Sequence, residues 1–329
     1  MATSIPPKRR AQFFRELAQL TKSGISVTKA AKVLGQDWRG GEVLRAVTQM
    51  ETGIAAGLSI AGALQPNLTS MEHSIIEAAE RGGQLAQGFR HLEEYYQLLD
   101  KTHDKVRGAV LYPLFILHAA VLLPAIVAAV TTKTSVLMAI AVGLALIWGF
   151  LAILWWGGRW VGQLAERHEA VDRFLGWIPL VAPARQALAL ARWHAVFHFT
   201  IASSQRISDG LRQAGMATQR FLLAAASRRA AQSVEDGSEL GPALLAQSAF
   251  PREMSATLAS AEFSGNLDTE TLRCSRESMS EAAITLENSS QRLCRLLYGV
   301  VVILIAWQIL QMAGTVAGQY QKAFTDLGF

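Results

Sequence analysis

Residues 109–130 have the sequence AVLYPLFILHAAVLLPAIVAAV, which contains no Asp, Glu, Lys or Arg. At about 1.5 Å of rise per residue, a helix of this length crosses a hydrocarbon core of roughly 30 Å. Residues 136–156 (VLMAIAVGLALIWGFLAILWW) are equally free of charge and follow after a short turn, so the pair predicts a transmembrane hairpin. Residues 296–316 predict a third span, with Gln308 and Gln311 as its only amide side chains.

Composition agrees with a membrane protein. Of the 329 residues, 51% are hydrophobic and 17% are charged, and the mean hydropathy is +0.23, which is more apolar than usual for a soluble chain. Strand-like runs of alternating Val, Ile and Thr are hard to find, so we predict an all-α membrane protein. Cys274 and Cys294 are too few for a disulfide framework or a four-cysteine zinc site, and we expect both to be reduced.

Basic residues near the predicted spans indicate the orientation. Span one is preceded by Lys101, Lys105 and Arg107, span two is followed by Arg159 and Arg167, and span three is preceded by Arg292 and Arg295. The turn between spans one and two offers only Lys133 and the C-terminal tail only Lys322. The positive-inside rule therefore places residues 1–108 and 158–295 in the cytoplasm and the tail, 317–329, in the periplasm. The N-terminus carries no apolar signal-peptide region, so we expect it to stay in the cytoplasm of a bacterial cell, with this multi-pass chain in the inner membrane.

These boundaries define five parts. Residues 1–108 form a first cytoplasmic helix bundle, 109–157 a transmembrane hairpin, 158–295 a second cytoplasmic bundle, 296–316 the third span and 317–329 the tail. The excess of basic residues, with a sequence pI of about 9.4, fits contact with anionic lipid at the cytoplasmic leaflet. No nucleic-acid partner is therefore expected.

The two cytoplasmic parts share an internal repeat. ERGGQL at 80–85 aligns with EFSGNL at 262–267, so that Glu80 and Gly83 match Glu262 and Gly265. Upstream, GLSIAGAL at 57–64 aligns with GSELGPAL at 237–244. Further upstream, Gly24-Ile25-Ser26 aligns with Arg206-Ile207-Ser208. The unit is a helical bundle followed by a span, used twice.

Local patterns predict the helices of the first bundle. Apolar residues at helical spacing form two stripes that end at Gly24 and Gly57. Thr69 and Glu72 are typical of a capping box, and Gly82-Gly83 ends the helix that follows. A further helix places Leu85, Phe89, Leu92, Tyr96 and Leu99 on one face, whereas Leu272, Met279, Leu286 and Leu293 of the second bundle recur every seven residues, as in a stalk.

Glu80 and Glu262 lie in the last turn of their predicted helices, where a carboxylate opposes the helix dipole. Two interpretations are open. Either each carboxylate accepts hydrogen bonds from the N-terminal amides of the next helix, or it faces a partner.

The sequence contains no recognisable enzyme motif. It has no Gly-Lys dipeptide, which excludes a Walker A loop, and no GxSxG or HExxH, so no catalytic residue and no cofactor are predicted. His194 and His198 are four residues apart, but no further ligand completes a metal site, and we expect them beside the core. His118 in span one has no acidic partner in any span, so we expect a neutral imidazole hydrogen-bonded between helices.

Order, spacing and duplication of these motifs resemble the type II secretion F-domain family, the GspF/PilC-like inner-membrane platform proteins of type II secretion and type IV pilus systems. In the first copy, the matching residues are Gly57, Ser59, Leu64, Glu80, Gly83 and Leu85. In the second copy, they are Gly237, Leu244, Phe250-Pro251, Glu262, Gly265 and Leu267. Two departures are that Glu239 replaces the motif Ser and Arg206 the upstream Gly.

The resemblance implies a non-enzymatic scaffold that couples a cytoplasmic hexameric secretion ATPase to pilin or pseudopilin assembly. Its implied partners are this ATPase, other inner-membrane assembly components, pilin or pseudopilin subunits and further copies of the chain. Platform proteins of tight-adherence pili or archaeal filaments share the pattern. A small-solute transporter would need polar or charged residues in the spans, and a membrane-anchored enzyme would need a catalytic site.

Overall fold

A computed structural model describes residues 5–37, 41–131 and 136–326, and every regular element in these ranges is a helix. This confirms the all-α class. The turn at 132–135 and the last residues of the tail, 327–329, lie outside the described residues, as do the side chains of 120–131 in the predicted first span.

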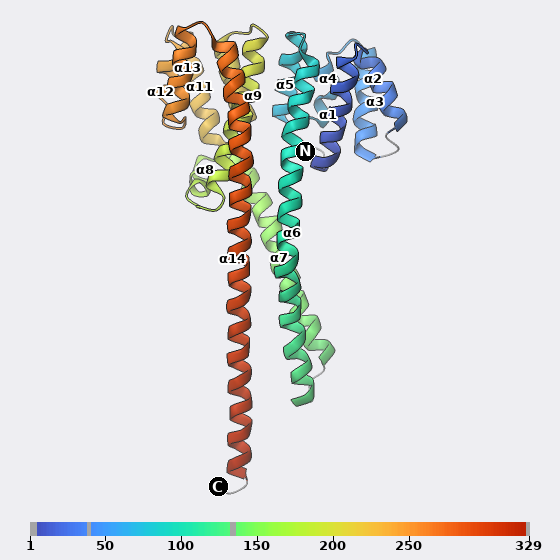
Figure 1. Ribbon diagram of the computed structural model, residues 1–329, viewed down its shortest axis with the longest axis vertical. Helices are drawn as coiled ribbons and strands as arrows, with labels where there is room; N and C mark the ends of the chain where they lie inside the picture. Colours follow the sequence, from blue (N-terminus) through green and yellow to red (C-terminus); the bar gives the residue numbers. More distant parts are fainter. Residues whose placement is uncertain (1–4, 38–40, 132–135, 327–329) are drawn as a thin grey trace. The chain divides into compact units, whose positions relative to one another are not determined.

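The described residues between 5 and 131 form six α-helices and a short 3₁₀ turn, and the last of these helices contains the predicted first span (Figure 1). They are α1 (Pro7–Lys22), α2 (Val27–Asp37), α3 (Gly41–Ala55), α4 (Ile60–Leu64), η1 (Gln65–Asn67), α5 (Ser70–Arg81) and α6 (Leu85–Thr131). The predicted capping box is present, because Thr69 accepts from the amide of Glu72 and the Glu72 carboxylate accepts from the amide of Thr69.

The remaining helices run from residue 136 to residue 326. They are α7 (Val136–Arg167), α8 (Glu169–Gly176), α9 (Ala182–Ala202), α10 (Ile207–Ala217), α11 (Phe221–Glu235), α12 (Leu240–Leu245), α13 (Arg252–Phe263) and α14 (Leu267–Asp326). The upstream alignment of Gly24 with Arg206 is wrong in register. Gly24 has φ +77°, whereas the left-handed residue before α10 is Ser204, at φ +56°, and Arg206 is the extended N-cap.

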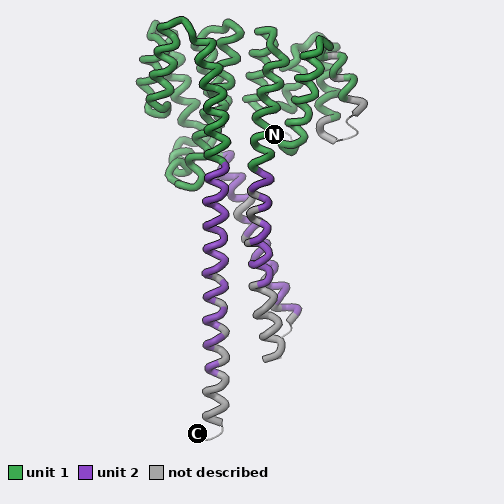
Figure 2. The backbone as a smooth tube through the Cα atoms, in the orientation of Figure 1, with its two compact units in different colours: residues 1–102, 164–286 green, residues 103–163, 287–329 purple. Residues whose placement is uncertain are grey.

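The structure divides into two compact units (Figure 2). Unit 1 comprises Met1–Thr102 and Leu164–Leu286, and unit 2 comprises His103–Gln163 and Glu287–Phe329. In unit 2, α6 and α14 are joined by an ion pair between Lys105 and Glu287 at 2.7 Å and by the stacked rings of Tyr112 and Tyr298.

Two helical segments are long and apolar enough to cross a membrane. They are Ile140–Arg167 and Leu267–Gln311, and almost none of their most apolar windows is buried inside the protein. Exposed side chains of this kind include Trp156, Ile303 and Leu310, each at least 70% exposed. Burial against other parts of the chain therefore does not account for these apolar surfaces.

Unit 1 has an aromatic core in each of its two chain segments. In the first, Phe14 stacks on Phe89 and Tyr96, with ring centroids 6.3 and 5.9 Å apart. In the second, the fully buried Trp193 stacks on Phe197 at 4.7 Å and donates to the Ser227 hydroxyl at 2.8 Å. The segments meet where α5 packs against α9 and α10.

Candidate functional site

The first motif cluster joins segments about twenty residues apart. Glu80, in the last turn of α5, accepts hydrogen bonds from the amides of Ile60 at 2.8 Å and Ala61 at 3.2 Å. These amides open α4 and have no acceptor within that helix. Ser59 adds an N-cap, because its hydroxyl accepts from the amide of Gly62 at 3.1 Å. A negative charge at this helix start is also favoured by the helix dipole.

Glu262 makes the same contacts in the second bundle. Its carboxylate accepts from the amides of Leu240 at 3.0 Å and Gly241 at 3.3 Å, which open α12. The N-cap residue, Glu239, makes no side-chain capping bond. The start of α12 therefore depends on Glu262 more than the start of α4 depends on Glu80.

The first interpretation, in which each carboxylate accepts hydrogen bonds from helix N-terminal amides, was right about the type of contact but wrong about which helix supplies the amides. Each carboxylate bonds the short helix before its own, α4 or α12, and not the helix that follows. The reason is topological, because α4 and α5 form a tight helical pair in which the end of α5 returns to the start of α4. The motif residues Ser59 and Glu80 thus meet in space.

The other motif residues shape the turns and the core around this contact. The four motif glycines adopt positive φ values, which glycine tolerates best: Gly57 (+84°), Gly83 (+66°), Gly237 (+97°) and Gly265 (+70°). Leu64 and Leu244 are fully buried, and Phe250 is 5% exposed. Leu85 and Leu267 are partly buried against the same core.

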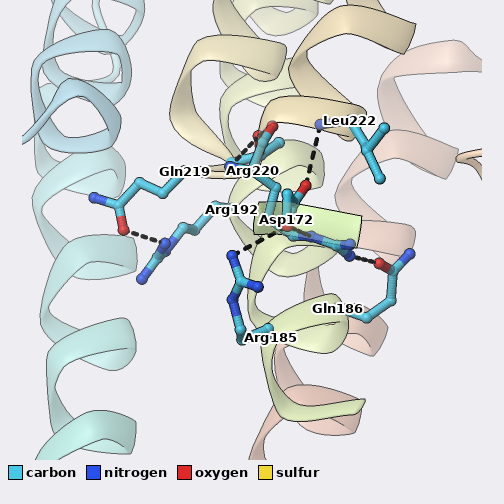
Figure 3. A network of polar contacts seen from close by, with 8 residues as sticks. Asp172, Arg185, Gln186, Arg192, Gln219, Arg220 and Leu222 are labelled. Carbon is cyan, nitrogen blue, oxygen red and sulfur yellow. Dashed lines mark hydrogen bonds and ion pairs between the residues drawn. The ribbon is translucent and has the colours of Figure 1, made fainter. Parts of the chain in front are cut away.

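A second polar cluster is centred on Asp172 of α8, which is completely buried (Figure 3). One carboxylate oxygen lies 3.1 Å from guanidinium nitrogens of both Arg185 and Arg220. The other oxygen accepts from the backbone amide of Leu222 at 3.1 Å, near the start of α11. A buried charge is tolerated when it is paired and hydrogen-bonded in this way.

The cluster extends toward the first bundle through Arg192 of α9. Its Nε donates to the Tyr95 hydroxyl of α6 at 2.7 Å, and another guanidinium nitrogen donates to the side chain of Gln219 (Figure 3 shows the latter). Arg192 thereby links the two bundles within unit 1.

A model of the family described as type II secretion system (T2SS), protein F, matches residues 13–132 and 198–313. The chain belongs to this family. The two matched stretches contain all of the motif residues described above.

Similar proteins of this T2SS protein F family come from secretion and from pilus systems. The chain is 26% identical to the type 4 fimbrial assembly protein PilC of Pseudomonas putida over 303 residues, which cover 80% of this chain and 73% of that protein. It is 26% identical to the type II secretion system protein F of Aeromonas hydrophila over 282 residues, covering 77% and 71%. It is 22% identical to the type IV pilus assembly protein PilC of Pseudomonas aeruginosa over 288 residues, covering 80% and 77%.

The two histidines four residues apart on α9 of this T2SS protein F family member lie in packed surroundings. His194 and His198 are 4% and 6% exposed, and their Nδ1 atoms lie 2.8 Å from the Ser278 hydroxyl and 3.2 Å from the Thr271 hydroxyl. Burial lowers the pKa of His194 to about 4. In the described part of the chain, no three His, Cys, Asp or Glu side chains gather into a metal-binding group.

Two other expectations concern single side chains. His118 Nδ1 lies 2.7 Å from the carbonyl oxygen of Leu114 in its own helix, and its ring contacts Trp148 edge-on. The ring therefore touches a second helix, but the hydrogen bond is not between helices as expected. Cys274 is buried and Cys294 is partly exposed, both as free thiols.

Sequence reasoning missed the buried ion pairs. No local pattern marks Arg10, yet it forms a 2.5 Å pair with Glu72 and donates to the Tyr96 hydroxyl at 3.2 Å. Glu72 was recognised as a capping residue, without its second role. Asp172 and its arginines are far apart in sequence, and no local pattern connects them.

Proposed function

We propose that this chain is a non-enzymatic inner-membrane platform of a type IV pilus or type II secretion machine. In this role it couples a cytoplasmic secretion ATPase to the assembly of pilin or pseudopilin subunits. The observation that carries the proposal is the family match over both bundles and the helices that leave them. The relatives named for pilus assembly and for secretion leave both systems open.

Three transmembrane helices are part of this proposal. The exposed apolar surfaces of α7 and α14 support two of them. The uncharged stretch 109–130, within the continuous helix α6, supports the third. With the basic residues placed as described, both bundles face the cytoplasm.

The proposal also includes the internal repeat. Helix order supports it, because α1 to α6 correspond in sequence to α9 to α14, with α7 and α8 inserted between. Both ends of α13 lie 182 residues after those of α5. The matching contacts of Glu80 and Glu262 support it independently. In this view, the motif residues Gly57, Ser59, Leu64, Glu80, Gly83 and Leu85 and their counterparts hold each bundle in shape.

Buried polar clusters of this kind suit a scaffold that transmits force. Arg10 with Glu72, and Asp172 with two arginines, form buried contacts that reach between helices. Such pairs fix the relative positions of helices more than they add net stability. A rigid bundle continued by long helices into the bilayer can pass a displacement from an ATPase to the membrane.

Deletion of the chain from its source bacterium tests the function. We expect loss of surface pili or of type II secretion, restored by the plasmid-borne chain. The full-length chain in detergent should also retain a hexameric ATPase in a pull-down, whereas an inner-membrane protein without cytoplasmic bundles should not. Normal assembly and secretion in the deletion strain, with ATP hydrolysis or solute transport by the purified chain, would overturn the proposal.

Reporter fusions test the orientation separately. Alkaline phosphatase is active only outside the cytoplasm, so fusions after Leu99 and after Ser290 should be inactive. Activity at either position would contradict the arrangement with both bundles in the cytoplasm.

A further inference from the structure

The turn between α10 and α11 contains a residue with a strained backbone. Gln219 adopts φ +55°, in the left-handed region that suits glycine, and it directly follows Thr218, the C-cap of α10. A residue with a side chain adopts this conformation at an energetic cost, and helices that end in this way usually do so with glycine. Such strain persists only where the surrounding contacts determine the backbone. The contacts of this turn therefore decide whether Gln219 keeps its conformation.

One of these contacts connects the turn to the first bundle. Arg192 of α9 donates from one guanidinium nitrogen to the side-chain oxygen of Gln219, and its Nε donates to the Tyr95 hydroxyl at 2.7 Å. Tyr95 belongs to α6 and is only 3% exposed, and the Arg192 guanidinium carbon also lies 5.7 Å from the centre of its ring. Because both hydrogen bonds come from one planar guanidinium group, its aim at Gln219 depends on Tyr95. The first bundle thus helps to hold the strained residue of the second.

The next residues of the same turn hold the Asp172 cluster. Arg220 is the extended N-cap of α11, and its Nε donates to Asp172 at 3.1 Å. The Leu222 amide donates to the other carboxylate oxygen at 3.1 Å. Figure 3 shows Gln219 pointing toward Arg192 while Arg220 reaches Asp172. Because Gln219 and Arg220 share one peptide plane, a rotation of the Gln219 backbone redirects Arg220.

We propose that this turn is a conformational switch between the two bundles of unit 1. While Tyr95 holds Arg192, Gln219 stays left-handed and Arg220 stays on Asp172. When the first bundle shifts and releases Arg192, the Gln219 backbone relaxes and the hold of Arg220 on Asp172 loosens. The strained residue is thus a two-state element that both contacts bias, which is the physical requirement for coupling between distant sites.

The switch goes beyond the proposed function and does not depend on it, because every contact that forms it lies within unit 1. Asp172 belongs to α8, which directly follows α7 in the chain. A movement of the first bundle would therefore be passed through Arg192 and the turn to the segment by which the chain enters the second bundle.

Hydrogen exchange at the Leu222 amide reports the state of the switch. This amide lies in the first turn of α11, where helix amides have no acceptor within the helix, so its protection depends on Asp172. Tyr95→Phe removes the hydroxyl that holds Arg192 and keeps the packed ring. In the detergent-purified full-length chain, we expect exchange at Leu222 to rise by at least about fivefold, the lower end of typical coupling between sites. Mass spectrometry with electron-transfer fragmentation measures this single amide.

Tyr96→Phe is the matched control. Tyr96 is the neighbouring buried tyrosine, and its hydroxyl accepts from Arg10 within the first bundle at 3.2 Å. The substitution therefore removes the same type of bond without touching Arg192, and exchange at Leu222 should stay unchanged. An equal rise for both variants would mean that each only destabilises the chain, and no rise for Tyr95→Phe would mean that no coupling exists. Either result would overturn the switch.

Gln219→Gly tests whether the turn carries the coupling. Glycine adopts the left-handed conformation without steric cost and offers Arg192 no side chain, so the turn should stay formed whether or not Tyr95 holds Arg192. In this background, we expect Tyr95→Phe to leave exchange at Leu222 unchanged. Ser204→Gly, at the other left-handed residue with a side chain in the described part of the chain, is the control and should preserve the effect of Tyr95→Phe. If Tyr95→Phe raised the exchange equally with glutamine and with glycine at position 219, the coupling would bypass the turn and the switch would be wrong.

Discussion

The turn after α5 is covered by another helix, whereas the matching turn after α13 is open. A Cβ atom on Gly82 would lie 3.1 Å from the Cβ atom of Ser203, just after α9, while the matching residue, Ser264, is exposed. His91 packs edge-on against Phe199 at 5.7 Å, while Arg273, at its matching position, is half-exposed between Glu270 and Glu277. Two segments with the same helix order thus differ where only one of them is covered.

This difference separates two kinds of position. Glu80 and Glu262, which hold the short helices, keep their residue type and contacts in both bundles. The covered turn carries Gly82 and His91, whereas the matching residues at the open turn are the polar Ser264 and Arg273. Substitutions at matched positions therefore show which contacts belong to each bundle alone and which belong to the junction of α5 with α9.

The largest effect is expected for Glu262→Ala. It leaves two helix-start amides of α12 without an acceptor, and hydrogen bonds to charged groups contribute about 1.5–3 kcal/mol each. We expect a loss of about 3 kcal/mol in the free energy of unfolding, and a smaller loss for Glu80→Ala because Ser59 still caps α4. Thermal unfolding of the detergent-purified chain, followed by circular dichroism, measures both.

Glu77→Ala is the matched control on α5. Glu77 makes a surface pair with Arg81, four residues along the same helix, which should contribute only about 0.3–0.5 kcal/mol. If Glu262→Ala were no more destabilising than Glu77→Ala, the carboxylate would not be what holds the short helix.

Acid pH should weaken the second bundle and its junction. Burial lowers the pKa of His194 to about 4, and burial with the nearby His198 lowers the pKa of His91 to about 4. In the unfolded chain, a histidine binds a proton below about pH 6.5, so stability falls as the pH is lowered from 6.5 toward 4. For His194 the expected loss is about 2 kcal/mol between pH 7 and pH 5.

Unfolding curves at pH 7, 6 and 5 measure this dependence. His194→Phe, which introduces the residue found at the matching position Phe14, should reduce the slope with pH. His168→Phe, at an exposed position, serves as the matched control variant. An identical slope in wild type and His194→Phe would contradict the prediction.

Gly82→Leu and Ser264→Leu compare the covered and open turns directly. Gly82 has an ordinary helical φ of −82°, so the substitution tests space and not backbone strain. Overpacking against Ser203 should cost about 1–3 kcal/mol, whereas Ser264→Leu at an exposed position should change stability by less than about 0.5 kcal/mol. The same unfolding assay applies, and equal effects would mean that the two turns are equally covered.

Local sequence patterns predicted the helices and their ends well. The predicted features are the capping box of α5, the breaks at Gly24, Gly57 and Gly83, and the buried face of Phe89, Leu92 and Tyr96. All of them depend on residues within one or two turns. Each pattern has a local physical cause, such as a positive φ or an unsatisfied helix-start amide.

Contacts between distant residues were not predictable in this way. The prediction for Glu80 named the correct type of partner, helix-start amides, but the wrong helix. The pairing depends on how α4 and α5 pack, which no local pattern shows. No prediction was made for Asp172, because its buried ion pair depends on Arg220, 48 residues later. The left-handed residue before α10 is Ser204 and not a glycine, so the sequence offered no marker for this turn, and Gly24 was aligned with Arg206 instead.

The smallest expected effect concerns this last pair, Gly24 and Ser204, which occupy matching left-handed turns at φ +77° and +56°. For a residue with a side chain, the left-handed conformation costs roughly 1–2 kcal/mol. Glycine removes this cost but loses about 0.4–1 kcal/mol through the greater freedom of the unfolded chain. Ser204→Gly should therefore stabilise the second bundle by about 0.5 kcal/mol, and Gly24→Ser should destabilise the first by a similar amount. Opposite signs in the unfolding assay would show that the two turns share one backbone conformation, whereas destabilisation by both substitutions would mean that Ser204 is held by its side chain and that the match of the two turns is limited to the backbone trace.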